Sequence, residues 1–174
     1  LVRTDAQGNE VWSRAYGSEM DEEGYAAAEL PDGGFLVLGA LLHPGGDYVA
    51  QDPDVYLVRT DESGQPLWAR ALEQPGAHGG HRIVPAADGT FFILGLRTDD
   101  SSKAELDPLV LAIDAEGGLL WQRDIGEANV DDYISGVLPS TDGGYLLTGM
   151  AMRGSRGSIP LSKLDGSGQL LWRR

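Results

Sequence analysis

The sequence contains no cysteine, so disulfide bonds and thiolate metal sites are both excluded. It also lacks long apolar runs, and no stretch approaches the roughly 20 residues that a membrane-spanning helix requires. Basic residues are few: 13 Lys and Arg stand against 27 Asp and Glu, which gives a formal net charge of −14. Because this charge repels phosphate backbones, nucleic acid is not an expected partner.

Glycine, in contrast, is abundant, with 25 residues. A segment that begins at Leu1 recurs from Leu57, Leu111 and Leu161, and each copy has an Asp, a Gly three residues later and a Trp seven residues after the Asp. The successive Trp residues are 56, 53 and 51 residues apart. Self-similarity at such a period predicts a repeat architecture. The anchor residues are Asp5, Gly8 and Trp12; Asp61, Gly64 and Trp68; Asp114, Gly117 and Trp121; Asp165, Gly168 and Trp172.

A second unit alternates with the first and places Asp-Gly before a short apolar run, at 31–39, 87–95 and 141–149. Asp-Gly and Asp-x-x-Gly are turn sequences, because Gly accepts the positive φ that other residues resist. Each repeat therefore predicts two hairpins. The four strands of the first complete repeat are expected at 24–30, 35–39, 55–60 and 67–72.

The apolar runs at 35–38 and 91–94 are continuous, whereas a strand with one wet face should alternate. Both faces of the sheets should therefore be covered, as in a radial stack of small sheets. We predict an all-β fold, a β-propeller or open propeller arc of about three and a half four-stranded antiparallel blades. The single repeat domain spans 1–174, with a half blade at 1–16 and blades at 22–72, 78–126 and 131–174.

The combined pattern L-x-x-x-D-x-x-G-x-x-x-W, then Gly-Tyr, then D-G-G-[FY]-x-x-x-G resembles the bacterial and archaeal secreted β-propeller repeats that occur in tandem in cell-surface proteins and lipoproteins. It is also similar to the tryptophan-docking repeats of quinoprotein dehydrogenases, which have one more residue between the Asp and the Gly. The resemblance implies a secreted, periplasmic or cell-surface protein.

The half blade at 1–16 lacks the hairpin that would pair with its first strand. Three solutions stay open: more chain in a longer parent protein, a partner chain that supplies the hairpin, or an open arc. Self-assembly through the unpaired end strands belongs with the second solution. The chain begins within a repeat strand, so we expect it to be part of something longer.

The strict register of the Trp residues with Asp and Gly predicts that the indoles serve packing and do not stack on carbohydrate. The repeat Asp residues should accept hydrogen bonds from turn amides. Gly39, Gly95 and Gly149 are expected to end the second strand of each blade, and Gly at this position marks a bulge or a close backbone approach.

The long, dissimilar connections of the predicted blades all fall on the face opposite the short turns, where binding residues usually lie. About half of the acidic residues are found there, and two pairs come just before the innermost strand of a blade: Asp21 with Glu22, and Asp131 with Asp132. Clustered carboxylates suit a hard cation, which makes Ca²⁺ a candidate cofactor. A basic partner, or a solvated rim that serves solubility alone, is the alternative.

His78 and His81 lie in the link between the first two complete blades as a His-x-x-His pair. This spacing is compatible with a shared metal, although the loop offers no evident third ligand. The alternative is two ordinary surface residues. The sequence does not identify a metal.

The chain has neither a Gly-x-Ser-x-Gly elbow nor a glycine pattern for nucleotide phosphates. The sequence favours a non-enzymatic interaction or scaffold module of a bacterial secreted or cell-surface protein, which binds a protein, glycan or cation through the acidic variable-loop face. The alternative is a fragment of a propeller enzyme. This would be a quinoprotein-like dehydrogenase, or a glycoside-active propeller that draws its carboxylates from different blades.

Overall fold

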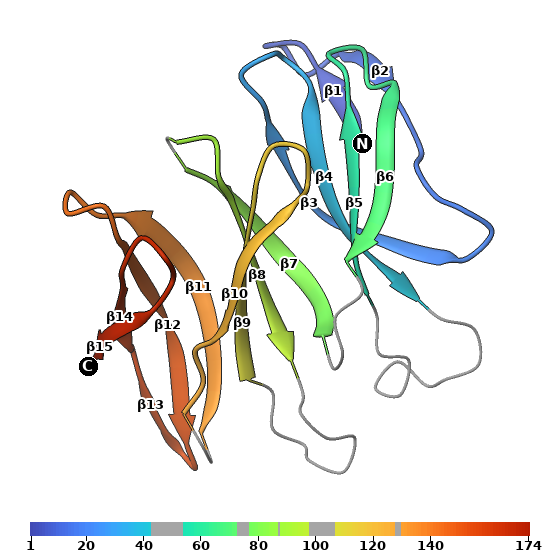
Figure 1. Cartoon of the computed structure of the whole chain (residues 1–174). Helices are drawn as coiled ribbons and strands as arrows, with labels where there is room; N and C mark the ends of the chain where they lie inside the picture. Colours follow the sequence, from blue (N-terminus) through green and yellow to red (C-terminus); the bar gives the residue numbers. More distant parts are fainter. Residues whose placement is uncertain (43–53, 73–76, 87, 98–106, 128–129) are drawn as a thin grey trace.

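The computed structural model describes residues 1–42, 54–72, 77–86, 88–97, 107–127 and 130–174. Within these residues the regular elements are all strands, and they form four antiparallel sheets (Figure 1). The predicted all-β, antiparallel fold is therefore confirmed.

The sheets follow one another along the chain, and we number them in that order. Sheet 1 has two strands, β1 (Val2–Thr4) and β2 (Glu10–Ser13). Sheet 2 has the order β3-β4-β5-β6, with bounds Asp21–Glu29, Phe35–Leu42, Asp54–Thr60 and Pro66–Leu72. Sheet 3 has the order β7-β8-β9-β10, with bounds Ala77–Pro85, Phe91–Arg97, Asp107–Ile113 and Leu119–Asp124. Sheet 4 has the order β11-β12-β14-β15, with bounds Asp131–Pro139, Tyr145–Arg153, Leu161–Leu164 and Leu170–Arg173, while β13 (Arg156–Ser158) pairs with β12.

The first two strands of the first complete repeat are longer than the predicted 24–30 and 35–39. In sheet 2, β3 begins at Asp21 and β4 ends at Leu42, and these two residues pair with each other across the ladder. A bulge in β3 between Gly24 and Ala26 shifts the register by one residue, and the ladder continues beyond Gly39 in the shifted register.

The expectation that Gly39, Gly95 and Gly149 end their strands is wrong, since each strand continues for two to four residues beyond the glycine. The close backbone approach expected at these positions is confirmed for Gly39 and Gly149. A Cβ atom at Gly39 would lie 2.3 Å from the Glu23 carbonyl oxygen, and one at Gly149 would lie 1.8 Å from that of Tyr133. Only glycine lets the two backbones come so near.

Sheet 3 is covered on both faces. Phe91 and Ile93 of β8 belong to the apolar core shared with sheet 2, whereas Phe92 and Leu94 belong to the core shared with sheet 4. All four side chains are buried. The continuous apolar run at 91–94 thus supplies two cores at once, as predicted.

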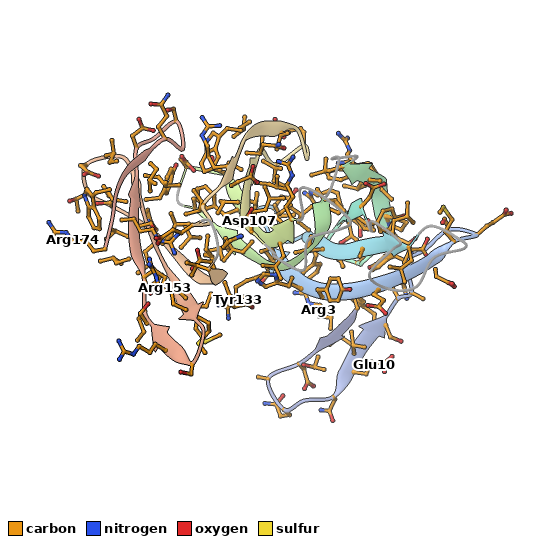
Figure 2. All side chains as sticks on the ribbon, turned by 90° about the horizontal axis from the view of Figure 1, so that it is seen from below. Arg3, Glu10, Asp107, Tyr133, Arg153 and Arg174 are labelled. Atoms are coloured by element: carbon orange, nitrogen blue, oxygen red, sulfur yellow. The ribbon has the colours of Figure 1, made fainter. Side chains whose placement is uncertain are left out.

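The three larger sheets stand in a row, face against face (Figure 1). Strand β7 contacts β3, β4 and β5, and strand β11 contacts β8 and β9, so the first strand of each sheet lies against the sheet before it. Seen from below, sheet 4 with Arg153 and Arg174 lies at one end of the row, and sheet 1 with Arg3 and Glu10 lies beside sheet 2, beneath it in this view (Figure 2).

Candidate functional site

The strands of each sheet begin and end at two distinct ends of the molecule. The Asp-x-x-Gly and Asp-Gly turns lie at one end, which we call the turn end. At the opposite end Asp21 pairs with Leu42, Leu41 with Asp54, and Arg97 with Asp107. We call this the loop end, because β4 ends and β5 begins there, as do β8 and β9 (Figure 1). All six candidate binding residues belong to strands β3, β7 and β11, and those nearest the loop end are Asp21 and Asp131.

The first acidic pair divides into an exposed and an engaged carboxylate. Asp21 is exposed. Glu22 is partly buried, and its carboxylate accepts hydrogen bonds from the Ser18 amide (2.6 Å) and hydroxyl (2.5 Å). Burial raises the pKa of Tyr56, and the negative charge of Glu22 raises it further. Glu22 therefore holds the segment before β3 and lies near a phenol.

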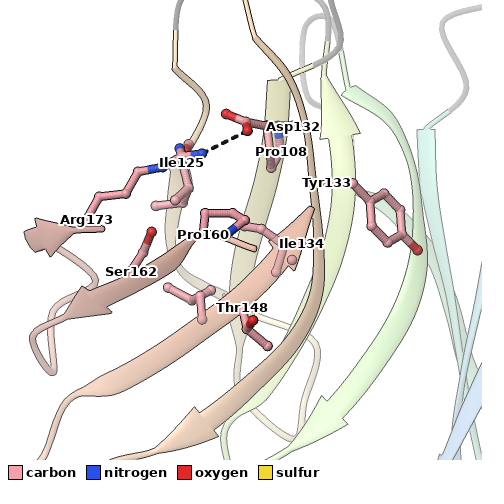
Figure 3. A pocket seen from close by; sticks show the side chains of 11 residues that line it. Pro108, Ile125, Asp132, Tyr133, Ile134, Thr148, Pro160, Ser162 and Arg173 are labelled. Carbon is pink, nitrogen blue, oxygen red and sulfur yellow. Dashed lines mark hydrogen bonds and ion pairs between the residues drawn. The ribbon is translucent and has the colours of Figure 1, made fainter. Parts of the chain in front are cut away.

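The second pair contains a buried carboxylate. Asp132 accepts hydrogen bonds from the Arg173 guanidinium (2.8 Å) and from the Glu127 amide (2.9 Å), and its side chain is almost fully enclosed (Figure 3). Arg173 also donates to the carbonyl of Ile125 at 2.6 Å. The ion pair joins β11 to β15, and both oxygens of Asp132 are engaged inside the protein. Removal of Arg173 would leave the Asp132 charge buried and uncompensated. The side chain of Asp131 lies outside the described part of the structure.

His81 lies between sheets 3 and 4. Its ring stacks on that of Tyr133, with centroids 4.8 Å apart and planes inclined at 21°. Burial lowers the pKa of His81, so the imidazole is neutral at pH 7. His78 is part of β7, but its side chain is outside the described residues, and the structure does not show whether the two histidines approach each other.

Among the described residues, no three His, Asp or Glu side chains are grouped so that they could hold a metal ion. The cavity beside Asp132 and Arg173 measures about 10 Å³, room for about one water molecule (Figure 3). The same described residues include no helix long and apolar enough to span a membrane.

A larger groove of about 290 Å³ lies between sheet 1 and sheet 2, and Glu22 and Glu23 line the part of it nearest the loop end. Its lining includes Glu22 and Glu23, the rings of Tyr16 and Tyr56, and Arg14. Tyr16 is fixed, because its hydroxyl donates to the Gly64 carbonyl at 2.9 Å and spans the two sheets. Carboxylates beside phenol rings form a surface that attracts a cationic group.

The repeated Trp residues make the same contact in each repeat. The Trp12 ring covers Gly64, the Trp68 ring covers Gly117, and the Trp121 ring covers Gly168. A Cβ atom at these glycines would lie 2.8, 2.5 and 2.7 Å from the respective ring. Each Trp thus packs on the Asp-x-x-Gly turn of the following repeat, and the predicted packing role is confirmed for these three. We call this the Trp–Gly contact.

The turn beneath each Trp is held by its Asp. Asp61 Oδ1 accepts hydrogen bonds from the Ser63 amide (2.8 Å) and the Gln65 amide (2.9 Å). Asp5, Asp114 and Asp165 accept the corresponding pairs of amides in their own turns. The predicted capping of turn amides is therefore confirmed.

Each Trp is accompanied by an arginine that sequence reasoning missed. The Arg123 guanidinium donates to the Ser167 carbonyl (3.3 Å), in the turn that Trp121 covers. Hydrogen bonds from the Ser63 hydroxyl and from the amides of its own turn lower the pKa of Asp61, and the positive charge of Arg14 lowers it further. The spacing Trp-x-Arg recurs in all four copies and was the available signal: Trp12 with Arg14, Trp68 with Arg70, Trp121 with Arg123, and Trp172 with Arg174.

A scan with family models matched none to this chain, and a search of curated proteins gave no match. Function is therefore inferred from the contacts of the described residues.

The Trp–Gly contact predicts that two equivalent glycines differ in their tolerance of alanine. Gly8 and Gly117 both have positive φ (86° and 76°), so alanine costs each turn about 1–2 kcal/mol of left-handed strain. At Gly117 the added methyl also meets the Trp68 ring, whereas the space at Gly8 is open. Urea unfolding at low protein concentration should show Gly117→Ala to be less stable than Gly8→Ala by about 1–3 kcal/mol.

The control for this comparison is the same pair in a Trp68→Ala background, where the excess loss at Gly117 should disappear. Equal losses for Gly8→Ala and Gly117→Ala in the wild-type background would contradict the contact.

A second prediction concerns the Asp-Gly turn of sheet 4. The Asp142 carboxylate accepts from Lys163 Nζ at 2.5 Å, and Lys163 is buried. This bond and one from the Gly144 amide lower the pKa of Asp142 from 3.8 to about 2. The stabilisation is therefore complete above about pH 4 and is lost as the pH falls through about 2.

Asp142→Asn should lower the melting temperature at pH 7, and its difference from wild type should shrink between pH 4 and pH 2. Asp88→Asn is the matched control, because Asp88 occupies the same turn position but Ala112 replaces the lysine. A difference for Asp142→Asn that stays constant over this range, or one that Asp88→Asn reproduces, would refute the assignment.

Proposed function

We propose that the four sheets are blades of a β-propeller or an open propeller arc, with a half blade at 1–16 and complete blades at 22–72, 78–126 and 131–174. Three features support this arrangement: the meander order within the larger sheets, the coverage of both faces of sheet 3, and the Trp–Gly contact between successive sheets. These are the relations expected of neighbouring blades.

The chain then acts as a non-enzymatic interaction and scaffold module that binds a protein partner through its acidic loop end. One observation carries this proposal. The residues that recur in the repeats hold the sheets together, whereas the carboxylates of the groove, Glu22 and Glu23, lie toward the loop end, where the repeats differ. Variable residues on a rigid scaffold are the usual location of binding.

The groove fits a basic side chain of that partner. Glu22 supplies negative charge beside the Tyr56 ring, and Glu23 lines the same surface. A lysine or arginine that enters the groove would form an ion pair with the carboxylate and a cation–π interaction with the aromatic ring. The net charge of −14 would speed the approach of a basic protein. The resemblance of the repeats to secreted propellers supports a secreted, periplasmic or cell-surface location.

The test uses a hexalysine peptide and two variants that remove one negative charge each. Glu22→Gln keeps an acceptor for Ser18, so the segment before β3 should stay in place. Glu116→Gln is the matched control, exposed at the turn end. In calorimetric titrations at about 10 mM salt, Glu22→Gln should weaken binding about threefold or more, because the charge it removes lies beside the bound cation.

Glu116→Gln should change the affinity by less than about 1.5-fold, since its charge lies far from the groove. Equal weakening by both variants would mean that the peptide senses only net charge, which would contradict a site at the loop end.

A further inference from the structure

The series of Trp–Gly contacts leaves one half unmatched at each end. Gly8 has the same positive φ as Gly64, Gly117 and Gly168, yet no atom lies within 4 Å of its Cβ position. At the other end of the row, Trp172 is 39% exposed. Among the described residues, the Gly8 turn thus has no covering indole, and Trp172 has no glycine turn to cover.

The outer face of sheet 4 has the composition of a docking face. Ile159 stands at the position of Val55, six residues before the turn Asp, and Leu161 stands at the position of Leu57. Val55 is 1% exposed where sheet 2 meets sheet 3, whereas Ile159 is 81% exposed. Leu57 is likewise fully buried, and Leu161 is exposed. Positions that are buried between internal sheets therefore hold exposed apolar residues here: Leu161 in β14 and Ile159 just before that strand.

Sheet 1 has the complementary face. Val2 stands three residues before its turn Asp, the position that Val58 occupies in sheet 2. Val58 is 2% exposed and Val2 is 58% exposed. The equivalent residue of sheet 3, Leu111, faces sheet 2 and is fully buried. Val2 is thus on the side of sheet 1 that would receive a preceding sheet.

The charges of the two ends also match. Arg174 lies over the Trp172 ring, 5.5 Å from its centroid, in the position from which Arg123 reaches the turn of Asp165. The turn at the other end carries the carboxylate of Asp5. The row therefore has an arginine beside Trp172 at one end and an acidic turn at the other, like the Arg123 and Asp165 turn of the internal contact.

We propose that sheet 4 of one copy of this chain docks on sheet 1 of a second copy, so that Trp172 covers Gly8 and Arg174 lies beside the Asp5 turn. The contact is head to tail, because each copy contributes a different face. It repeats the Trp–Gly contact that the chain forms three times internally. It does not use the loop end or the groove, so it holds whether or not the proposed binding function is correct.

The test is the molar mass in solution, measured by sedimentation velocity over a wide range of protein concentration. Wild type should rise above the monomer mass of 18.6 kDa as concentration increases. Trp172→Ala should raise the concentration needed for association about tenfold or more, since a central aromatic anchor dominates such an interface. A wild-type chain that stays monomeric throughout would overturn the proposal.

Leu171→Ala is the matched control, because it removes an exposed apolar side chain from the same strand. Its counterparts Leu67 and Leu120 are exposed within the row, so this position takes no part in docking. Leu171→Ala should associate like wild type, and circular dichroism should show all variants to be folded. Equal loss of association in Leu171→Ala and Trp172→Ala would contradict the assigned face.

Mixing distinguishes the head-to-tail arrangement from pairing of sheet 4 with itself. Val2→Lys alters sheet 1 and leaves sheet 4 intact, whereas Trp172→Ala does the reverse. At a protein concentration where wild type associates, each variant alone should be monomeric, and an equimolar mixture should form dimers and nothing larger. Association of Val2→Lys alone at the wild-type level would show that sheet 1 is not involved and would overturn the proposal.

Discussion

The structure depends on the contact between an indole ring and a glycine turn of the next repeat. The ring can lie on the turn only because the glycine has no Cβ, and the turn can form only because glycine accepts positive φ. The Asp that accepts the turn amides keeps the backbone in place beneath the ring. The three residues that define the repeat therefore form one unit, and that unit joins neighbouring sheets.

A structure assembled in this way gains its stability from neighbour to neighbour. Sheet 3 shows the consequence most clearly, since its strands contribute alternate side chains to two cores and bury both sets. Because the joining residues are used at the turn end and in the sheets, the loop end can differ from repeat to repeat without loss of the fold. This separation is what makes a binding role for the loop end physically reasonable.

The hairpins, their turns and the number of sheets could be predicted from sequence because each depends on residues that are close along the chain. The capping of turn amides by Asp61 and its counterparts is local in the same sense. The partner of each Trp was not predictable in this way, since Trp68 reaches Gly117 in another repeat. Recurrence shows that a residue matters in its own repeat, and it does not show which neighbour the residue contacts.

The candidate site shows the same limit. The acidic pair at 131–132 was expected to line a binding surface, yet Asp132 is enclosed by Arg173, a residue 41 positions away. The ring of His81 was expected in a surface link, and it stacks on Tyr133 of the next sheet. Asp21, at the start of β3, is exposed as expected. Contacts between residues so far apart along the chain produce no regular spacing in the sequence, so the sequence alone does not predict them.

The most direct measurement is the proton NMR shift of the glycine Hα atoms in the repeat turns, recorded on dilute protein. An indole lying on a glycine shifts its Hα resonance upfield by the ring current. The account predicts strong upfield shifts for Gly64, Gly117 and Gly168, and an ordinary shift for Gly8, whose turn is uncovered. Four similar shifts would contradict the claim that each Trp docks on the turn of the following repeat.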